Sequence, residues 1–471
     1  MLKYDLIIRD CLVVDPLNKI NKVTSIGLAK GEIVETGDDL DGKVARQVVG
    51  FPGAILMPGL IDTHMHCSEW LGGELAFGML SRAGVTTALD MAGPTTSVLH
   101  AMKKRGSGIN VATLEAVRPG VSVKDLNPSY DECASLLQKS LSEGAIGLKL
   151  TGGHYPLTPE ATANAIKAAT DGRSYMAFHA GSAKNGSNIE GFMDAVEFAD
   201  GRPFHMAHIN AYCRGMIMKD PKEEMQLAIR TLKDNRQIVS EFHPAPLNGT
   251  SGKCKDNQPE SHVTRNCLRM GGYPETEGGL RQALKDGYAQ VSWENLDGEN
   301  RYVQGMKAFE YWENMKGICT CCFPVNDRES AFLCASAVDE NGNFVIDALS
   351  SDGGGIPRNF MIRYGYQLVT WGLWTIEDYV RMTSLNPARM LGLENKGHLS
   401  PGADADITIF DPIERKPLLT LVKGKGVCSN GVLLAEGGTV ICTEKGYDSV
   451  KSAGLNAQIV NLEKSMLYAG R

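Results

Sequence analysis

Two histidines stand one residue apart at the end of an apolar run, in the sequence GLIDTHMH at residues 59–66. If this run is a β-strand, side chains at i and i+2 point to the same face, so His64 and His66 direct two imidazoles towards one point. Imidazole nitrogens are good ligands for zinc and similar divalent ions. Burying such a pair without a partner would also be costly. The spacing therefore predicts part of a metal site.

Further residues of types that bind metals or carry protons follow at the ends of later apolar runs. They are Lys149, His179, His208 and Asp352. Together with the histidine pair they suit two divalent ions, which can hold a hydroxide and polarise a carbonyl. The lysine is the unusual member, because a buried ammonium beside two cations would have to lose its charge. A single strand histidine is more often a hydrogen-bonded core residue, so the prediction depends on the whole set.

The elements that must position these residues are eight short apolar runs that alternate with helical patterns, which is typical of βα units and a parallel sheet. Eight such units predict an α/β fold, a (β/α)8 TIM barrel, whose active site lies at the carboxyl ends of the strands. The candidate residues all fall at or near those ends. The expected strands are 60–66, 85–92, 110–117, 145–153, 175–181, 203–209, 238–244 and 347–355.

The barrel is predicted to span residues 56–397, and the remaining parts of the chain are organised around it. Residues 1–55 and 398–445 alternate or run apolar between Gly and Asp turns, and we join them into one small β-sandwich domain. The stretch 247–346 is too long for one βα connection and is predicted to be an insertion over the barrel mouth. The tail at 446–471 has apolar residues near helical spacing and no core left to join, which predicts a homo-oligomer contact.

Composition limits the class of protein. The 471 residues are 43% apolar and 22% charged, enough for a large core, and the formal net charge of −7 with no long basic run argues against nucleic acid or anionic lipid as a partner. No stretch approaches the ~20 apolar residues of a membrane span, and the start lacks a signal-peptide pattern. Twelve cysteines without such a signal favour reduced thiols. We expect a cytoplasmic protein that acts on a small molecule.

The ordered combination of motifs resembles the amidohydrolase superfamily. Within it, the chain is similar to the branch of dihydroorotases, hydantoinases, β-aspartyl dipeptidases and D-aminoacylases, over residues 1 to about 445. The resemblance implies metal-dependent hydrolysis of a non-peptide amide bond, in a cyclic amide, an N-acyl amino acid or an isopeptide. It is carried by PGLIDTHMH, Lys149, His179, HMAHIN, SSDGGG, MTSLNPARMLGL and KGHLSPGADADITIFD.

The resemblance also implies a bridge between two metal ions, most simply Zn²⁺. Lys149 would react with CO₂, and its carbamate would bridge the ions and remove the charge problem. D-aminoacylases generally use another bridging ligand, for which Cys67 is the alternative here; it is one residue out of phase with the histidine pair, so we favour Lys149. The run CTCC at 319–322 could also hold a metal, but no second Cys/His pair follows at zinc-finger spacing, so we favour a buried strand.

By the same resemblance, the histidines divide between the two ions. His64 and His66 would bind the more buried ion with Asp352, and His179 and His208 would bind the more exposed one. Asp352 would take the proton of the attacking hydroxide and pass it to the leaving nitrogen. His205 competes with His208 for its role, and the family pattern HIN favours His208.

Other residues are candidates for contacts with the substrate. His154 lies five residues after Lys149, where hydantoinases carry a tyrosine that steadies the oxyanion, so the resemblance makes His154 a candidate catalytic residue. An arginine near the mouth can bind a substrate carboxylate with its forked guanidinium. Arg358 ranks first, because the neighbouring glycines let a ligand come close. Arg214 and His243 are the other substrate-binding candidates.

Two other functions stay open. A deaminase of the same superfamily usually has a Glu three residues after the histidine of the fifth strand, where this chain has Ser182. A non-catalytic scaffold like the hydantoinase relatives that lost their ligands is disfavoured, because all six ligand positions are filled here. The sequence therefore predicts a hydrolase and leaves its substrate open.

Overall fold

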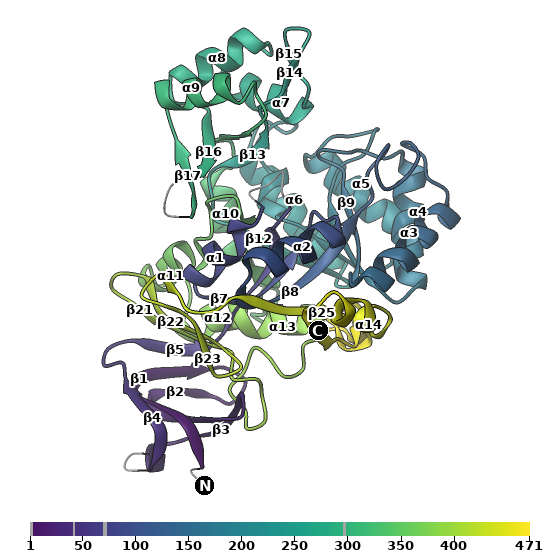
Figure 1. Ribbon diagram of the computed structural model, residues 1–471. Coiled ribbons are helices and arrows are strands. Elements are labelled where there is room, and N and C mark those ends of the chain that lie inside the picture. The colour runs from purple at the N-terminus through teal and green to yellow at the C-terminus, as the bar shows by residue number, and fades with distance from the viewer. Residues whose placement is uncertain (1–2, 41–42, 69–72, 295–297) are drawn as a thin grey trace.

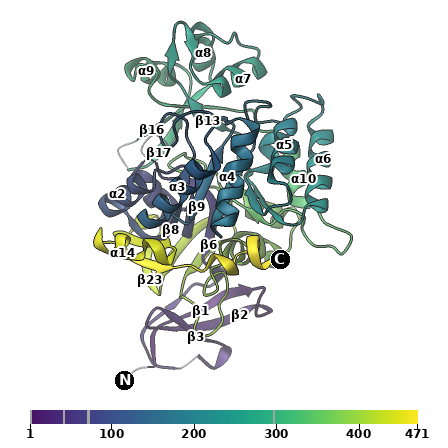
Figure 2. The same cartoon turned by 90° about the vertical axis from the view of Figure 1, so that its right-hand side faces the viewer.

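The computed structural model describes residues 3–40, 43–68, 73–294 and 298–471. Figures 1 and 2 show three parts, one above another: a β-rich domain that contains the N-terminus, a central α/β barrel, and a smaller unit over the opposite end of the barrel. Among the described residues, no helix combines the length and apolar character that a bilayer crossing needs.

The barrel is a parallel sheet closed by its last segment. That segment pairs with β12 through Ala348 and Leu349 and with β6 through Gly353 and Gly354, so it joins the last strand to the first. The predicted eight strands are confirmed, with a break in the eighth. They are β6 (Leu60–His66), β7 (Val85–Asp90), β8 (Ser107–Ala116), β9 (Gly147–Thr151), β10 (Tyr175–His179), β11 (Phe204–Met206), β12 (Ile238–Phe242) and the split pair β19 (Ala348–Leu349) and β20 (Gly353–Gly354).

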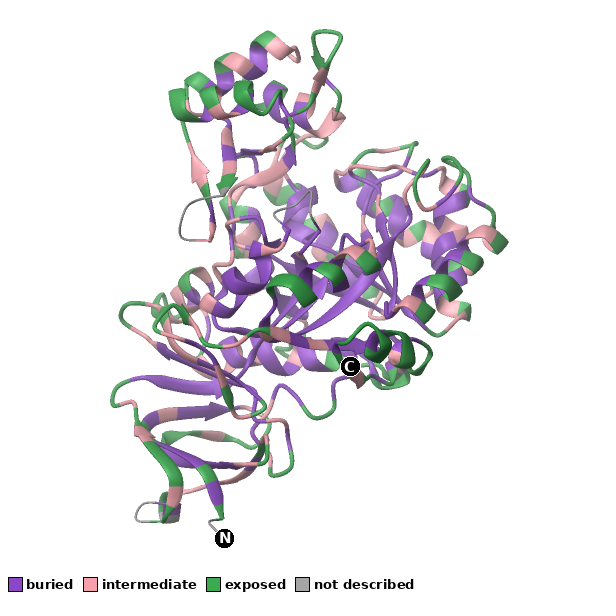
Figure 3. Ribbon diagram, in the orientation of Figure 1, coloured by how far each residue is buried: buried purple, intermediate pink, exposed green. Residues whose placement is uncertain are grey.

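Helices cover the outside of the barrel and begin at caps that the sequence indicates. Thr158 accepts a hydrogen bond from the backbone N–H of Ala161, and Asp220 accepts one from Lys222, each directly before a helix that opens with proline. Figure 3 shows buried strands inside helices whose outer faces are exposed. The helices are α1 (Leu75–Arg82), α2 (Thr95–Arg105), α3 (Tyr130–Glu143), α4 (Pro159–Asp171), α5 (Ile189–Ala199), α6 (Pro221–Asp234), α10 (Arg328–Ser336), α11 (Tyr366–Thr370), α12 (Ile376–Val380) and α13 (Asn386–Leu391).

The inserted unit lies over the barrel mouth and has its own core, which includes Leu268, Leu280, Trp312 and Phe323. Its four-stranded antiparallel sheet has the order β13-β18-β16-β17. It ends before α10, which packs on α6 of the barrel, so the predicted limits of 247–346 are too wide. Its elements are β13 (Asn248–Ser251), β14 (Cys254–Lys255), β15 (Gln258–Pro259), α7 (His262–Met270), α8 (Glu277–Lys285), β16 (Gln290–Glu294), β17 (Asn300–Val303), α9 (Met306–Asn314) and β18 (Thr320–Phe323).

Both chain ends contribute to one nine-stranded sheet. The two ends meet where β21 runs antiparallel to β5, with Ile407 opposite Pro58 and Phe410 opposite Ile55. The strands are β1 (Tyr4–Asp15), β2 (Ile20–Ala29), β3 (Glu32–Thr36), β4 (Ala45–Gly50), β5 (Ile55–Pro58), β21 (Ile407–Asp411), β22 (Lys416–Val422), β23 (Lys425–Ser429) and β24 (Val432–Leu433).

The C-terminal segment differs from the sequence-based expectation. β25 (Gly437–Cys442) was expected in the sandwich but pairs with the first part of the long strand β8, from Ser107 to Ala112, and with β26 (Asn456–Ile459). After α14 (Glu444–Ser452), α15 (Met466–Ala469) follows. Leu462, Met466 and Leu467 are buried against core residues of the barrel strands, so the tail does find a core within its own chain. The argument for a homo-oligomer from these residues therefore loses its basis.

Candidate metal centre

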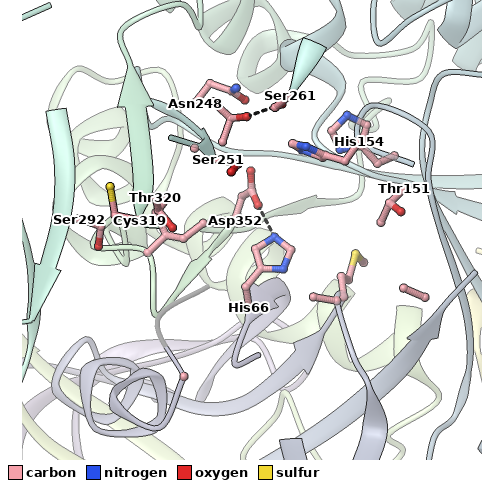
Figure 4. Close-up of a pocket in the computed structure, with 18 of the residues that line it drawn as sticks. His66, Thr151, His154, Asn248, Ser251, Ser261, Ser292, Cys319, Thr320 and Asp352 are labelled. Atoms are coloured by element: carbon pink, nitrogen blue, oxygen red, sulfur yellow. Dashed lines mark hydrogen bonds and ion pairs between the residues drawn. The ribbon is translucent and has the colours of Figure 1, made fainter. Parts of the chain in front are cut away.

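A cavity of about 1090 Å³ lies between the carboxyl ends of the barrel strands and the inserted unit. Figure 4 shows its floor, where His66 and Asp352 face each other, and its opposite wall, which carries Asn248, Ser251 and Ser261 of the inserted unit. The six residues predicted as metal ligands all line this cavity: His64, His66, Lys149, His179, His208 and Asp352. The six side chains thus meet at the carboxyl ends of the barrel strands, where the sequence predicted them.

The first group of donor atoms comes from β6 and from the break between β19 and β20. His66 Nε2 lies 2.9 Å and His64 Nε2 3.3 Å from Asp352 Oδ1. Ligand atoms of all three residues lie within 4.8 Å of one another. Asp352 has a left-handed backbone with φ of 48°, which turns its side chain towards the two histidines. Two imidazoles and a carboxylate at this separation fit one divalent ion.

Glu241 of β12 supports this group, and sequence reasoning missed it. Its buried carboxylate accepts hydrogen bonds from His64 Nδ1 at 2.7 Å, from the backbone N–H of His208 at 2.7 Å and from the Ser350 hydroxyl. With its proton on Nδ1, His64 presents the lone pair of Nε2 to the cavity. The sequence did carry a signal for Glu241, which is an acidic residue inside the apolar run IVSEF. A charge buried in such a run requires partners.

The second group is the histidine pair of neighbouring strands. His208 Nε2 lies 3.0 Å from His179 Nδ1, and the rings meet edge to face. Burial lowers the pKa of both imidazoles well below the ordinary value, which keeps them neutral and able to bind a metal. His205 instead contacts the Tyr175 hydroxyl at 3.2 Å in the barrel core. The choice of His208 over His205 agrees with this placement.

Lys149 is buried in the wall of the same cavity. Its Nζ donates to the thioether of Met91 at 3.0 Å. Burial lowers the pKa of this amine to about 8, although Glu241 and Asp352 partly oppose the shift. A thioether is a weak acceptor for an ammonium group. The amine is therefore held in a place where its charge is poorly stabilised.

Asp352 is tied to two residues that were predicted to bind substrate. Arg358 NH2 lies 2.6 Å from Asp352 Oδ2, its Nε donates to the Asp352 carbonyl, and its NH1 donates to the Leu247 carbonyl at 2.6 Å. His243 Nε2 lies 3.6 Å from Asp352 Oδ2. Burial alone would raise the pKa of the Asp352 carboxyl, but Arg358 and the neighbouring imidazoles hold it well below its usual range. Arg358 thus holds the Asp352 carboxylate, and because it also lines the cavity its contact with a substrate stays a prediction.

Of the other residues that the sequence singled out, some line the cavity and others lie in the core. Arg214 donates to Asn326 Oδ1 at 2.7 Å and to Asn248 Oδ1 at 3.2 Å, so it supports the cavity wall. His154 lines the cavity (Figure 4). The centre of its ring lies 5.4 Å from that of the His179 ring. Cys67 points into the core, where its Sγ lies 3.3 Å from Met65 Sδ, so the thiol alternative for the metal bridge is wrong. The CTCC run forms β18, as expected.

The donor set fits divalent metal ions. Buried imidazole nitrogens of His66, His208 and His243 have no hydrogen-bond partner within the described part of the chain. These are Nδ1 atoms, while the Nε2 atoms of His66 and His208 face other predicted ligands. Within the described residues, the cluster of His64, His66 and Asp352 meets the geometric criterion for a metal site.

Comparison with known proteins finds one family model and several relatives. Residues 309–454 match the model of the amidohydrolase family. Dihydroorotase from Elusimicrobium minutum (strain Pei191) is 24% identical over 443 residues, which cover 87% of this chain and 88% of the relative. The family match covers the C-terminal part of the chain, and the chain is similar to this dihydroorotase over most of its length. The resemblance found in the motifs is thereby confirmed.

Two further proteins are similar to this chain over most of its length. D-aminoacylase from Alcaligenes xylosoxydans xylosoxydans is 22% identical over 468 residues, covering 87% of this chain and 88% of the relative. The crystal structure of N-acyl-D-glutamate deacylase from Bordetella bronchiseptica, complexed with zinc and a phosphonate inhibitor, has a TM-score of 0.66 at 17% identity. It covers 97% of this chain and 99% of that chain. This likeness confirms the predicted fold of a TIM barrel with a β-sandwich.

Proposed function

We propose that this protein is an enzyme that hydrolyses an amide carbon–nitrogen bond outside ordinary peptides, in a cyclic amide, an N-acyl amino acid or an isopeptide. The observation that carries the proposal is the gathering of His64, His66 and Asp352 within 4.8 Å beside the His179–His208 pair. Relatives named dihydroorotase, D-aminoacylase and N-acyl-D-glutamate deacylase support this class of reaction.

Two divalent metal ions, with Zn²⁺ as the first choice, belong to the proposal. His64 and His66 with Asp352 would hold one ion, and His179 with His208 the other. Such ions supply a hydroxide at neutral pH and polarise the scissile carbonyl. The neutral state of the buried imidazoles supports this assignment, as does the zinc named for the Bordetella bronchiseptica deacylase.

Lys149 is proposed to carry a carbamate derived from CO₂ that bridges the two ions. The neutral Nζ would form a bond to the carbon of CO₂ and release one proton to solvent. Its lowered pKa of about 8 supports this step, because part of the amine is then neutral at physiological pH. The reaction replaces a cation by an anion and so removes the repulsion from two dications.

Asp352 is proposed to accept the proton of the attacking nucleophile and to deliver it to the leaving nitrogen. Its pair with Arg358 at 2.6 Å keeps the carboxylate ionised and ready to accept a proton. A proton that has arrived is then held weakly, because it competes with the same guanidinium, and this favours its transfer to the leaving group.

His154 is proposed to stabilise the oxyanion that forms from the scissile carbonyl. Burial, followed by the charges of His262 and His66, lowers the pKa of His154 to about 4. The imidazole is therefore neutral near pH 7 and carries one N–H that can donate to an oxyanion. Its place on the cavity wall near His179 supports the assignment.

The alternative functions are weaker on the residues present. A deaminase would need a carboxylate at position 182, where the Ser182 hydroxyl accepts hydrogen bonds from the backbone of Lys184 and Asn185. A non-catalytic scaffold would have no use for a complete set of ligands around one cavity. The hydrolase proposal uses every member of that set.

Location and assembly also remain proposals. We infer a reducing, cytoplasmic location, which the twelve free cysteines support. The tail no longer supports homo-oligomerisation, because its apolar residues are buried within the same chain, and light scattering at micromolar concentration would decide the oligomeric state.

The experiment that tests the function combines metal analysis with a substrate screen. The purified enzyme is loaded with zinc and offered hydantoins, dihydropyrimidines, N-acyl-D-amino acids and isoaspartyl dipeptides. We expect close to two zinc ions per chain and hydrolysis of one class, abolished by chelation. A chain that binds no metal, or a metal-loaded enzyme that leaves all four classes intact, would reject the proposal.

A further inference from the structure

The His179 imidazole has a second nitrogen that faces away from the other ligands. Its Nδ1 lies 3.0 Å from His208 Nε2, on the side where the two histidines would hold an ion together. Its Nε2 lies on the other side of the ring, 2.8 Å from the Ser187 hydroxyl. A neutral imidazole carries one proton, so a proton held on Nε2 leaves Nδ1 with a free lone pair.

The protein closes the Nε2 side of this ring. A Cβ atom at Gly153 would lie 2.1 Å from His179 Nε2, so the glycine lets the backbone after β9 pass directly against that nitrogen. The Ser187 hydroxyl lies within hydrogen-bond distance of the same atom. The Nε2 side is therefore occupied by protein groups, and Nδ1 is the nitrogen that faces the neighbouring ligand.

Ser187 belongs to a loop that is fixed where α5 begins. The backbone N–H of Asn188 donates to the Gly186 carbonyl at 2.9 Å. The Asn188 side chain caps α5 by accepting from the Gly191 N–H at 3.0 Å, and a Cβ atom at Gly191 would lie 2.0 Å from the Gly186 carbonyl oxygen. Ser187 lies between these tightly packed residues, so its hydroxyl stays beside His179 without a large further loss of conformational freedom.

His64 has a partner in the same position behind its ring, but one of different charge. His64 Nδ1 donates to the Glu241 carboxylate, which is an anion when ionised, whereas His179 Nε2 faces a neutral hydroxyl. A charged acceptor holds an imidazole proton more strongly than a neutral one and makes the metal-binding nitrogen more basic. The two histidines are thus oriented by partners of unequal strength.

We propose that Ser187 is a positioning residue for the second metal ion: its hydroxyl accepts the Nε2 proton of His179 and directs the Nδ1 lone pair towards His208. The inference rests on the proposed metal-dependent function and adds to it a residue that acts through His179 alone. Without the hydroxyl, the proton can move to Nδ1, and a protonated nitrogen cannot bind a cation. The hydroxyl therefore sets the affinity of the His179–His208 pair.

Zinc binding tests this role through variants of one loop. Ser187→Ala removes the acceptor, and we expect the second zinc ion to bind about 10-fold more weakly while the first is unchanged. Ser187→Thr keeps a hydroxyl and should restore the affinity. Ser182→Ala is the matched control, because the Ser182 hydroxyl accepts from the backbone of Lys184 and Asn185 in the same loop, and it should keep both zinc affinities.

Nitrogen NMR of the metal-free protein, with ¹⁵N-labelled histidine, gives a readout that needs neither metal nor turnover. The His179 signals are assigned by their loss in His179→Gln. We expect the proton on Nε2 in the wild type, and on Nδ1 or shared between both nitrogens in Ser187→Ala. A wild-type proton on Nδ1, or the same tautomer in Ser187→Ala as in the wild type, would overturn the inference.

The two measurements separate this inference from the proposed function. A protein that hydrolyses nothing, but whose second zinc ion is weakened by Ser187→Ala and not by Ser182→Ala, supports the inference, and the proposed hydrolysis then fails alone. Equal zinc affinities in Ser187→Ala and the wild type, or an equal loss in Ser182→Ala, overturn the inference and leave the hydrolase standing. A chain that binds no zinc overturns both.

Discussion

Replacing Glu241 by glutamine tests whether this buried carboxylate orients the metal ligands. Glu241 accepts hydrogen bonds from His64 Nδ1, the backbone N–H of His208 and the Ser350 hydroxyl. Glutamine has nearly the same size, but one of its two terminal groups is an NH₂ that cannot accept. In Glu241→Gln the amide oxygen can still accept from His64 and His208, but it is uncharged and therefore a weaker acceptor, so the His64 tautomer and ring orientation are held less firmly.

The expected loss is one of metal affinity. Removing a carboxylate that orients a metal-bound imidazole costs about 10- to 100-fold in affinity, or about 1.4 to 2.7 kcal/mol at about 1.36 kcal/mol per factor of ten. Burial raises the pKa of Glu241, so keeping its charge in the core is itself costly. The neutral glutamine avoids this cost, and we expect the free energy of unfolding of the metal-free protein to fall less than the metal affinity does.

Glu224→Gln is the control for a buried carboxylate outside the site. Glu224 accepts three backbone hydrogen bonds, from Gly215, Ile217 and Met218. Zinc affinity is measured by competition with a chromophoric chelator, and stability by urea unfolding of the metal-free proteins. We expect Glu224→Gln to lose stability and keep its zinc affinity. A folded Glu241→Gln variant that binds zinc as tightly as the wild type would refute the reasoning.

Three further variants test other parts of the account. Asp352→Asn should keep the fold and most of the metal but lower kcat at least ~10²-fold, because an amide cannot accept the proton, and near-normal turnover would exclude Asp352 as the base. Lys149→Ala should lose metal and activity together in a folded barrel, and added acetate should restore part of both; full activity without acetate would remove the carbamate from the account. Arg471→Met should lower the free energy of unfolding by about 1–3 kcal/mol, because Arg471 forms a two-pronged ion pair with Asp347 at 2.7 Å, and an unchanged urea midpoint would contradict this.

The barrel and its ligand positions could be predicted because their signals are local. The first strand has the predicted limits of 60–66, and its period of two places His64 and His66 on one face. The fifth strand ends at His179, inside the predicted range. Short apolar runs between turns carry this information without reference to the rest of the chain.

The features that could not be predicted from the sequence depend on contacts between distant segments of the chain. The contacts of Arg358 with Asp352 and the Leu247 carbonyl were not expected. The role of Glu241 depends on neighbouring strands, which bring His64 and the backbone of His208 to its carboxylate. The tail after β25 joins the barrel because its apolar residues meet the ends of several strands, which no local pattern reveals.

A crystal structure of the active enzyme, with anomalous data collected at the zinc edge, tests the central claim most directly. We predict two anomalous peaks at the barrel mouth roughly 3.5–4 Å apart, one beside His64 and His66 and one beside His179 and His208. Density for a carbamate should extend from Lys149 Nζ to both peaks. An active enzyme with no metal at these histidines, or with two ions and an unmodified Lys149, would contradict the account.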